Sequence, residues 1–265
     1  MPERIRVGVF GAAGRMGLTV CQAVIDDPDF DLVAAVDPHH AGLDLSEVGG
    51  VDGDDLVIAS GPDELVRKEV DVAIDFTHID AARENLAFLA SNGIHAVVGT
   101  SGFTDADYDE VRSRFTSSNC VVAPNFAIGA VLMSRFAEVA APYFETAEII
   151  ELHHDAKIDA PSGTAMHTAE RMAAASSDWA DDPTTHHVLD GARGGRGPGG
   201  IPVHAVRLRG IVAHQEVLLG TTGQSLSIRH DSYDRTSFMP GVVLAVKRVR
   251  ELPGLTVGLD DVLGI

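Results

Sequence analysis

The residues best suited to chemistry lie in the segment 151–165, which reads ELHHDAKIDAPSGTA. His153, His154 and Lys157 fall within five positions, and imidazole and ammonium groups can supply protons and positive charge to a reacting group. The PSGT run at 161–164 is typical of a helix start, where free backbone N–H groups and a partial positive charge suit a carboxylate or phosphate. The segment therefore predicts a site that binds an anionic substrate and delivers a proton to it.

Two other interpretations of this segment explain less. Adjacent histidines cannot bind a metal with i, i+4 spacing, and the nearby Asp155 and Asp159 complete no familiar ligand pattern, so we expect no metal here. An exposed polar loop before a capped helix is the simpler alternative, but it does not explain the lysine. Only three of the 20 basic residues are lysines, namely Lys68, Lys157 and Lys247, and the other 17 are arginines.

A second candidate site is the glycine-rich turn GAAGRMG at 11–17, which follows an apolar strand pattern and opens a helical pattern. Glycines at such a turn allow the backbone to approach a pyrophosphate at a helix N-terminus. The spacing is GxxGxxG rather than GxGxxG, because Ala13 stands where the middle glycine often does. Directly after the first strand, this motif predicts dinucleotide binding.

Asp37 ends the second predicted strand, 26 residues after Gly11, where an acidic residue commonly receives the ribose hydroxyls of a dinucleotide. A helix-capping or turn role for Asp37 is the alternative. No arginine or lysine follows directly to hold a 2′-phosphate, which favours NAD(H). Arg15 or a protonated His39 could still tolerate NADP(H).

Two further segments follow predicted strands. The loops at the carboxyl ends of parallel strands line the ligand crevice, so backbone groups of GTSG at 99–102 could reach the nicotinamide. A strand-ending turn is the alternative for this segment. The APNF run at 123–126 ends another strand at an expected domain boundary, where it suits a hinge as well as a cofactor contact.

These candidate residues need a scaffold, and the first half of the chain predicts one. Short β-branched runs alternate there with longer helical patterns, which is typical of right-handed βαβ units and a parallel sheet with helices on both faces. We therefore expect an α/β fold whose first domain is Rossmann-type. The expected strands are 5–10, 31–37, 70–76, 95–99 and 119–123, and the expected helices include 16–25 and 81–92.

The pattern changes after residue 125 and predicts a second domain of α+β type with an antiparallel or mixed sheet, because its last three strands follow one another without crossover helices. We expect the glycine-rich stretch 191–200 to be a mobile loop, and the final helix, 238–250, to return to the first domain. The domains are then 1–125 with 236–265, and 126–235. The expected elements are helices 128–141 and 162–175 and strands 147–152, 203–208, 215–219 and 225–229.

Composition narrows the class of protein. The 265 residues include 39 acidic and 20 basic side chains, and this acidity argues against nucleic acid or an anionic membrane as a partner. No apolar run approaches the roughly 18 residues of a membrane span, and no signal peptide is evident. Two cysteines without a framework of disulfides suit the cytoplasm. The acidic, lysine-poor surface indicates adaptation to high salt, or alternatively a GC-rich genome.

The chain resembles the 4-hydroxy-tetrahydrodipicolinate reductase (dihydrodipicolinate reductase) family over essentially its whole length. The motif at 151–165 is the most specific part of the resemblance, because it combines HHxxK with DAPSGTA. Asp155 and Ala156 depart from the basic or polar residues often found at those positions. The other matching motifs are GAAGRMG at 11–17, DFT at 75–77, GTSGF at 99–103 and APNFAIG at 123–129.

This resemblance implies roles for individual residues. His153 and Lys157 correspond to the acid catalysts of the family, and His154, Gly163 and Thr164 to residues that bind the carboxylates of the substrate. It also implies a homotetramer whose substrate-binding domains build a central sheet, and use of both NADH and NADPH, between which the residues after Asp37 favour NADH. The residues that would contact the cofactor are Gly11, Gly14, Arg15 and Met16 around the pyrophosphate, Asp37 at the adenine ribose, and Phe76, Thr77, Gly99, Thr100, Ala123 and Phe126 at the nicotinamide.

The implied reaction is the reduction of 4-hydroxy-tetrahydrodipicolinate to tetrahydrodipicolinate in the diaminopimelate route to lysine. After hydride addition to this small dicarboxylate, His153 or Lys157 would protonate the neighbouring carbon. The residues do not decide between these two donors, nor whether the ring is dehydrated on the enzyme. Two rivals remain at this point, another dehydrogenase of amino acids or sugar acids with the same cofactor domain, and a nicotinamide-sensing regulatory protein without turnover.

Overall fold

The structure is a computed structural model that describes residues 4–51 and 56–265. By its internal contacts the chain divides into two compact units. Unit 1 is formed by Met1–Phe126 and Phe238–Ile265, and unit 2 by Ala127–Ser237. The chain therefore leaves unit 1 once, builds unit 2 and returns.

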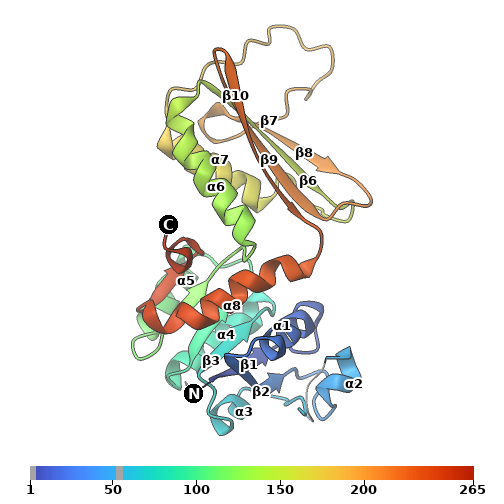
Figure 1. Ribbon diagram of the computed structural model, residues 1–265, viewed down its shortest axis with the longest axis vertical. Coiled ribbons are helices and arrows are strands. Elements are labelled where there is room, and N and C mark those ends of the chain that lie inside the picture. Colours follow the sequence, from blue (N-terminus) through green and yellow to red (C-terminus); the bar gives the residue numbers. More distant parts are fainter. Residues whose placement is uncertain (1–3, 52–55) are drawn as a thin grey trace. The chain divides into compact units, whose positions relative to one another are not determined.

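Unit 1 contains a six-stranded parallel sheet with the strand order β11-β5-β4-β3-β1-β2. The Rossmann-type fold is thus confirmed (Figure 1). The edge strand β11 was not predicted from the sequence, because three residues carry too little periodicity to predict a strand. The strands are β1 (Ile5–Phe10), β2 (Phe30–Val36), β3 (Val72–Asp75), β4 (His95–Val98), β5 (Cys120–Val122) and β11 (Leu255–Val257).

Helices cover both faces of this sheet, as Figure 1 shows. On one face, Leu65 of α3, Leu86 of α4 and Val111 of α5 join a single buried cluster with the strands. On the other face, α1 and α8 contact each other. The helices of unit 1 are α1 (Arg15–Asp26), α2 (Leu45–Gly49), α3 (Asp63–Arg67), α4 (Ile79–Ser91), α5 (Asp105–Arg114), α8 (Met239–Arg248), the 3-10 helix η4 (Val249–Glu251) and α9 (Asp260–Leu263).

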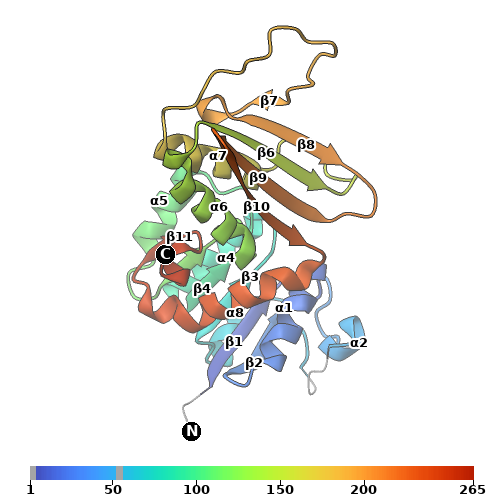
Figure 2. The ribbon, with the colours of Figure 1, turned by 45° about the horizontal axis from the view of Figure 1, so that its top comes forward.

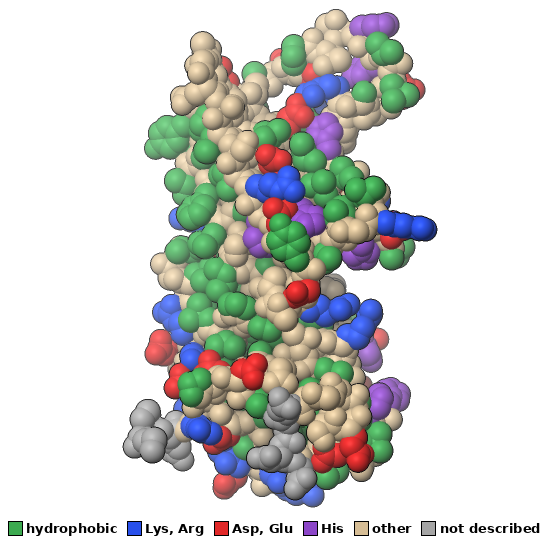
Figure 3. Space-filling view, turned by 45° about the vertical axis from the view of Figure 1, so that its right-hand side comes forward, with side chains coloured by type: hydrophobic (Ala, Val, Ile, Leu, Met, Phe, Trp, Pro, Cys, Tyr) green, Lys and Arg blue, Asp and Glu red, His purple; other side chains and the backbone are tan. Residues whose placement is uncertain are grey.

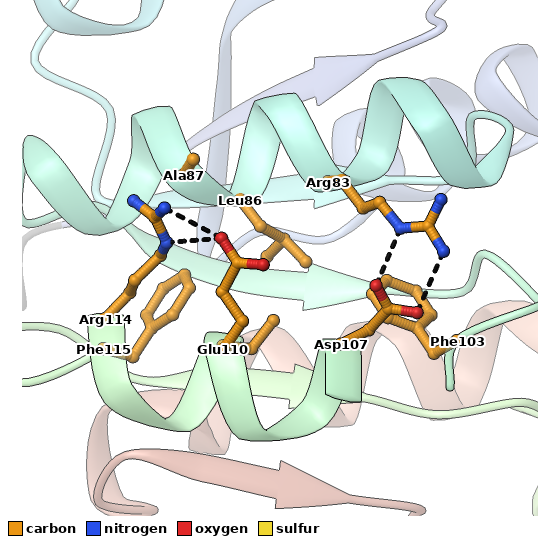
Figure 4. A pocket seen from close by; sticks show the side chains of 9 residues that line it. Arg83, Leu86, Ala87, Phe103, Asp107, Glu110, Arg114 and Phe115 are labelled. Carbon is orange, nitrogen blue, oxygen red and sulfur yellow. Dashed lines mark hydrogen bonds and ion pairs between the residues drawn. The ribbon is translucent and has the colours of Figure 1, made fainter. Parts of the chain in front are cut away.

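Ion pairs tie α4 to the start of α5 (Figure 4). Arg83 donates to both carboxylate oxygens of Asp107, with Nε–Oδ1 2.8 Å and Nη2–Oδ2 3.0 Å. Asp107 also accepts from the backbone N–H of Thr104, whose hydroxyl caps α5 in return. The hydrogen bond from Arg83 is the main reason that the pKa of Asp107 lies well below its usual range.

Unit 2 contains a five-stranded sheet with the order β10-β9-β6-β8-β7. β6 and β8 are parallel and the other neighbours are antiparallel, so the expected mixed sheet is confirmed. The elements are α6 (Ile128–Ala140), η1 (Ala141–Tyr143), β6 (Thr146–His153), α7 (Gly163–Ala175), β7 (Gly195–Arg196), η2 (Pro198–Gly200), β8 (Pro202–Arg207), β9 (Ala213–Thr221) and β10 (Gln224–Ser232), followed by η3 (Arg235–Phe238) where the chain returns to unit 1.

The two helices of unit 2 pack on one face of its sheet, as Figures 1 and 2 show. Met133 of α6 and Met172 of α7 join the buried cluster that contains Ile149 and Val217 from the strands. Successive side chains of a strand point to opposite faces. Ile150 and its neighbours in that phase therefore lie on a second face, which no helix of the described residues of unit 2 covers.

The glycine-rich stretch 191–200 contains more structure than the loop that we expected. Gly195 and Arg196 form β7, which pairs antiparallel with β8, and η2 follows directly. A Cβ at Gly194, where φ is +71°, would lie 2.6 Å from the carbonyl oxygen of Val203. The expectation was wrong because glycine here permits a close approach of two strands.

The surface on the face drawn in Figure 3 shows acidic and basic side chains interspersed with one another. Many of the described arginines form ion pairs with nearby acids, such as Arg112 with Asp109 at 2.7 Å. None of the helices in the described part of the chain is both long enough and apolar enough to cross a membrane.

Candidate functional site

The turn between β1 and α1 has the geometry that its glycines predict. Gly11 has a φ of +64°, and its carbonyl oxygen accepts a hydrogen bond of 2.9 Å from the N–H of Gly14. A Cβ at Gly17 would lie 2.0 Å from that same oxygen, so the first turn of α1 packs against the loop only because Gly17 has no side chain. The turn therefore brings Gly11, Gly14, Arg15 and Met16 to the start of α1.

The start of α1 offers positive potential. Gly14 precedes the helix without a side-chain cap, and the first turn contains no acidic residue. Backbone N–H groups of a first helical turn have no partner within the helix, and together with the helix dipole they favour an anion. A pyrophosphate fits these residues.

Asp37 directly follows β2, which pairs with β1 such that Val36 lies beside Phe10. Its side chain is nearly buried, and Oδ1 accepts a hydrogen bond of 3.0 Å from the N–H of His39 and lies 3.2 Å from Nδ1 of His40. The turn role considered for Asp37 is thus present at one carboxylate oxygen. Its position on the strand next to the glycine turn is also the one expected of a ribose ligand.

The remaining cofactor candidates follow β3, β4 and β5. Because these strands are parallel neighbours, their carboxyl ends meet at one edge of the sheet. A hydrogen bond of 2.9 Å from Oγ1 of Thr100 to the carbonyl oxygen of Thr77 joins two of these turns. We call the segments that follow β1–β5 at this edge the strand-end turns: they carry Gly11, Gly14, Arg15, Met16, Asp37, Phe76, Thr77, Gly99, Thr100 and Ala123.

Buried groups hold the strand-end turns in place. Asp75 is fully buried, and its Oδ1 accepts hydrogen bonds from the N–H (2.7 Å) and hydroxyl (2.6 Å) of Thr77. The rings of Phe76 and Phe126 lie 5.6 Å apart at 54°, and a Cβ at Gly99 would lie 2.0 Å from the Phe76 ring. Phe126 is 1% exposed, so it supports Phe76 from within the core of unit 1.

The chemistry of unit 2 is organised around Glu151, which lies on β6 with an exposed fraction of 0%. Its Oε2 lies 2.6 Å from Nδ1 of His153 and accepts from Nη1 of Arg207 at 2.9 Å. Its Oε1 accepts from Nη2 of Arg207 at 2.8 Å and from the N–H of Ser162 at 3.1 Å. One carboxylate therefore joins β6, β8 and the start of α7.

His153 and Lys157 lie close enough to influence each other. Burial lowers the pKa of His153 below its ordinary value; Glu151 opposes this, while Lys157 and Arg207 add to it. Nζ of Lys157 lies 2.8 Å from both carboxylate oxygens of Asp159. This hydrogen bond from Lys157 lowers the pKa of Asp159.

The candidate carboxylate-binding residues flank this pair along the chain. His154 is exposed and begins a turn in which its carbonyl oxygen accepts from the N–H of Lys157 at 3.2 Å. Gly163 begins α7, where Ser162 caps the helix and no acidic residue lies in the first turn, so the positive end of the helix dipole is retained. Residues 151–165, including Thr164, are called the HHxxK segment below.

Glu151 and Arg207 were not predicted from the sequence. One signal was available for Glu151: it continues the phase of Ala147 and Ile149, which face the core, and a charged residue in that phase requires a partner. Arg207 gave no local signal, because it lies 56 positions further along the chain. Among the described residues, no group of three or more histidine, cysteine or acidic side chains is placed to hold a metal ion.

Comparison with known proteins gives matches along nearly the whole chain. The model for "Dihydrodipicolinate reductase, N-terminus" matches residues 5–126, and that for the C-terminus matches residues 129–263. The chain belongs to the dihydrodipicolinate reductase family. Both the strand-end turns and the HHxxK segment lie inside the matched regions.

Relatives within the family cover the full length. A 4-hydroxy-tetrahydrodipicolinate reductase of Mycobacterium marinum is 52% identical, with 98% of this chain and 100% of the relative covered. One of Corynebacterium urealyticum is 50% identical, with 98% and 99% covered. A solved dihydrodipicolinate reductase from Paenisporosarcina sp. TG-14, described as dipicolinate-bound, is 39% identical with a TM-score of 0.86, covering 97% of this chain and 99% of the other.

Proposed function

We propose that this protein is an oxidoreductase that reduces 4-hydroxy-tetrahydrodipicolinate to tetrahydrodipicolinate with NAD(P)H, in the diaminopimelate route to lysine. The observation that carries the proposal is the HHxxK segment, which gathers His153, Lys157 and the start of α7 around buried Glu151. Family membership over the full length supports the same reaction.

The proposal assigns residues 1–125 and 236–265 to the binding of the dinucleotide. When bound, the cofactor supplies the hydride. Around it, the start of α1 favours the pyrophosphate, and Asp37 accepts hydrogen bonds from the adenosine ribose. NADH is the favoured cofactor, because the Asp37 carboxylate repels a 2′-phosphate, and use of NADPH is retained through Arg15 or a protonated His39.

The proposal assigns residues 126–235 to the dicarboxylate. His154, Gly163 and Thr164 bind its carboxylates, with positive potential from Lys157 and from the start of α7. That the solved relative is described as bound to dipicolinate, a planar dicarboxylate, supports this class of ligand. A protein with 39 acidic and 20 basic residues needs such a local concentration of positive charge to attract a dianion.

Protonation follows hydride addition, because the reduced ring is an electron-rich enamine whose neighbouring carbon must gain a proton. His153 and Lys157 are the two acids of the segment. Glu151 accepts only, so Nδ1 of His153 carries the hydrogen in their 2.6 Å contact and Nε2 is the atom that exchanges a proton. Lys157 holds its ammonium against Asp159 until the anionic substrate competes for it.

We also propose that four copies assemble through the open face of the sheet of unit 2. Ile150, Leu152, Val206 and Leu218 point to this face in the phase opposite to the core, and Leu208 is 55% exposed. Burying such a stripe against a second copy removes apolar surface from water. Light scattering is expected to give the mass of a tetramer, and a monomer at micromolar concentration would contradict this.

Two features concern the setting of the protein. Cys21 and Cys120 are free and buried, and burial raises the pKa of Cys21 to about 12, which agrees with a reducing cytoplasm. We further propose that the acidic, lysine-poor surface adapts the protein to high salt. Activity should then persist or rise as salt is added, and loss of activity at moderate salt would favour the GC-rich genome as the explanation.

The deciding experiment is a coupled assay in which dihydrodipicolinate synthase supplies the substrate, with NADH or NADPH, across a salt series. We expect substrate-dependent loss of the nicotinamide absorbance with both cofactors and faster loss with NADH. Oxidation with other imino or keto acids only would identify a different dehydrogenase. Tight NAD(H) binding without any substrate-dependent change would identify a regulatory protein.

A further inference from the structure

We propose that Glu151 and Arg207 are positioning residues that act together on both candidate acids, fixing the His153 ring and the loop that carries Lys157, with Arg207 offsetting the charge that Glu151 presents to His153. This inference rests on the proposed function, since it concerns the acids of that reaction. Neither residue is assigned a contact with the substrate.

The hydrogen bonds of Glu151 restrict the side chains of His153 and Arg207 and the backbone at Ser162. Four donors approach its two oxygens: Nδ1 of His153 at 2.6 Å, two nitrogens of Arg207 at 2.9 and 2.8 Å, and the N–H of Ser162 at 3.1 Å. A carboxylate with no exposed surface is stable only when it is paired and hydrogen-bonded in this way. Although burial raises the pKa of Glu151, the hydrogen bonds from Arg207 and His153 bring it below the ordinary value, so the group stays ionised.

The ionised carboxylate fixes the tautomer and orientation of His153. Since a carboxylate accepts and does not donate, the hydrogen of the neutral ring must lie on Nδ1. The N–H of Ser162 ties the same carboxylate to the start of α7. Glu151 therefore holds His153 in a fixed position relative to the start of α7. The proposed function assigns that helix start to the carboxylates of the substrate.

Arg207 extends the arrangement to the second acid. Besides Glu151, its Nη2 donates to the backbone carbonyl of Asp159 at 2.6 Å. The side chain of Asp159 holds Nζ of Lys157 at 2.8 Å. A single, partly buried ion pair therefore connects His153 on β6 to Lys157 in the following loop.

The charges around His153 do not all act in one direction. Glu151 on its own strand favours the imidazolium, whereas Arg207 from β8 and Lys157 from the loop disfavour it, in addition to burial. Asp159 is turned to Lys157 and Arg207. Burial is the largest of these influences, and it outweighs Glu151, so the pKa of His153 lies below its ordinary value and the ring is neutral at neutral pH. Because Arg207 binds both oxygens of Glu151, its positive charge opposes part of the effect of the carboxylate on this ring.

Because the two members of the ion pair carry opposite charges, removing either charge is predicted to shift the pKa of His153 in opposite directions. Glu151→Gln removes the negative charge, so the pKa of His153 should fall further. Arg207→Gln removes the offsetting positive charge, so the pKa of His153 should rise. Both variants should lower kcat by about 10- to 100-fold, a part of what general acid catalysis contributes, while NADH binding stays as in the wild type.

The matched control is Glu138→Gln. Glu138 also pairs with two arginines in unit 2, with 2.9 Å to Nη1 of Arg135 and 2.6 Å to Nη2 of Arg171. It lies on α6 rather than on β6 or β8. We expect unchanged kcat and an unchanged titration of His153 in this variant.

Arg207→Lys keeps the charge but cannot donate two parallel hydrogen bonds. It should lower kcat while leaving the titration of His153 close to that of the wild type. The comparison of Arg207→Gln with Arg207→Lys decides the question even where Glu151→Gln fails to fold.

The measurements are the NMR titration of the His153 ring, the pH profile of kcat, and KM for both substrates. Opposite titration shifts in Glu151→Gln and Arg207→Gln support the proposal. Shifts in the same direction, or a wild-type kcat in Arg207→Lys, would overturn it, because a purely structural pair would change both variants alike. If the wild-type protein fails to reduce the dicarboxylate, the proposed function fails, whereas the ring titration still tests the pair.

Discussion

The strand-end turns of unit 1 and the HHxxK segment of unit 2 are built in opposite ways. In the turns, the backbone carries the site: Gly11 has a positive φ, and Gly17 allows a contact that a side chain would prevent. In the HHxxK segment, side chains carry the site, and buried Glu151 and Arg207 hold them from two strands. A site made of backbone depends on the close approach of one backbone segment to another. A site made of side chains depends on charged partners that can lie far away in the sequence.

This difference predicts which property each region controls. Changes in the strand-end turns should alter cofactor binding through the shape of the backbone. Changes in the HHxxK segment should alter turnover through charge and proton supply. The distinction between the two regions would fail if variants of the strand-end turns changed turnover alone, or if variants of the HHxxK segment changed cofactor binding alone.

The largest effect is expected from Lys157→Ala. Losing the ammonium removes both a proton donor and positive charge at the developing anion, and kcat should fall by roughly 10²- to 10⁴-fold. The dissociation constant for NADH, measured by fluorescence, should change little. Lys68→Ala is the matched control, because Lys68 is an exposed lysine of unit 1. A wild-type turnover of Lys157→Ala would refute the assignment of the segment.

The next effect is expected from Gly17→Ala. The new Cβ would lie 2.0 Å from the carbonyl oxygen of Gly11, and such overpacking costs about 1–3 kcal/mol. If the turn shifts to relieve it, the NADH dissociation constant should rise roughly tenfold to hundredfold, while dipicolinate binding by calorimetry stays unchanged. Gly61→Ala, where no atom lies within 4 Å of the new Cβ, should behave as the wild type.

A smaller effect is expected from Asp37→Ala. Loss of a charged hydrogen bond to the ribose should raise KM for NADH by about tenfold. KM for NADPH should change less, because a negative charge near its 2′-phosphate is also lost. An equal rise for both cofactors would instead indicate the turn role, in which Asp37 holds the N–H of His39 at 3.0 Å. His40→Gln, which removes only the neighbouring imidazole, separates the two contributions.

The same contrast explains how much the sequence could predict. Gly11 and Asp37 could be predicted as cofactor-binding residues from the sequence, because each lies at or directly after the end of a predicted strand. A glycine after the first strand and an acid at the end of the second are typical of dinucleotide binding. His153 and Lys157 are visible as residue types. Arg207 is not, because its importance arises from the parallel pairing of β6 with β8, which brings together residues 56 positions apart.

The fold shows the same limit. Long alternating patterns predicted the parallel sheet and the mixed sheet correctly. The three residues of β11 (Leu255–Val257) and the two of β7 (Gly195–Arg196) were missed. Such short strands form because the edge of a neighbouring strand supplies hydrogen-bond partners. This is a contact between distant segments, so it leaves no periodic pattern in the local sequence.

The smallest effect tests whether side chains remote from both regions influence either one. Thr104 caps α5, and Asp107 in the first turn of α5 pairs with Arg83 of α4. Thr104→Ala should lower the free energy of unfolding by about 1 kcal/mol, measured by urea denaturation, with kcat and both KM values unchanged. A change in kcat would mean that the packing of α4 on α5 reaches the strand-end turns.

The pH dependence of the same variants separates the cap from the ion pair. Arg83 holds the pKa of Asp107 below its unfolded value of 3.8, so the stability that this carboxylate adds is present above that pH and is lost as the pH falls through the folded value. Asp107→Asn should therefore flatten the loss of stability in acid, whereas Thr104→Ala should leave most of the slope, since Arg83 still binds the carboxylate. Equal slopes in Asp107→Asn and the wild type would mean that the pair in Figure 4 contributes nothing to acid stability.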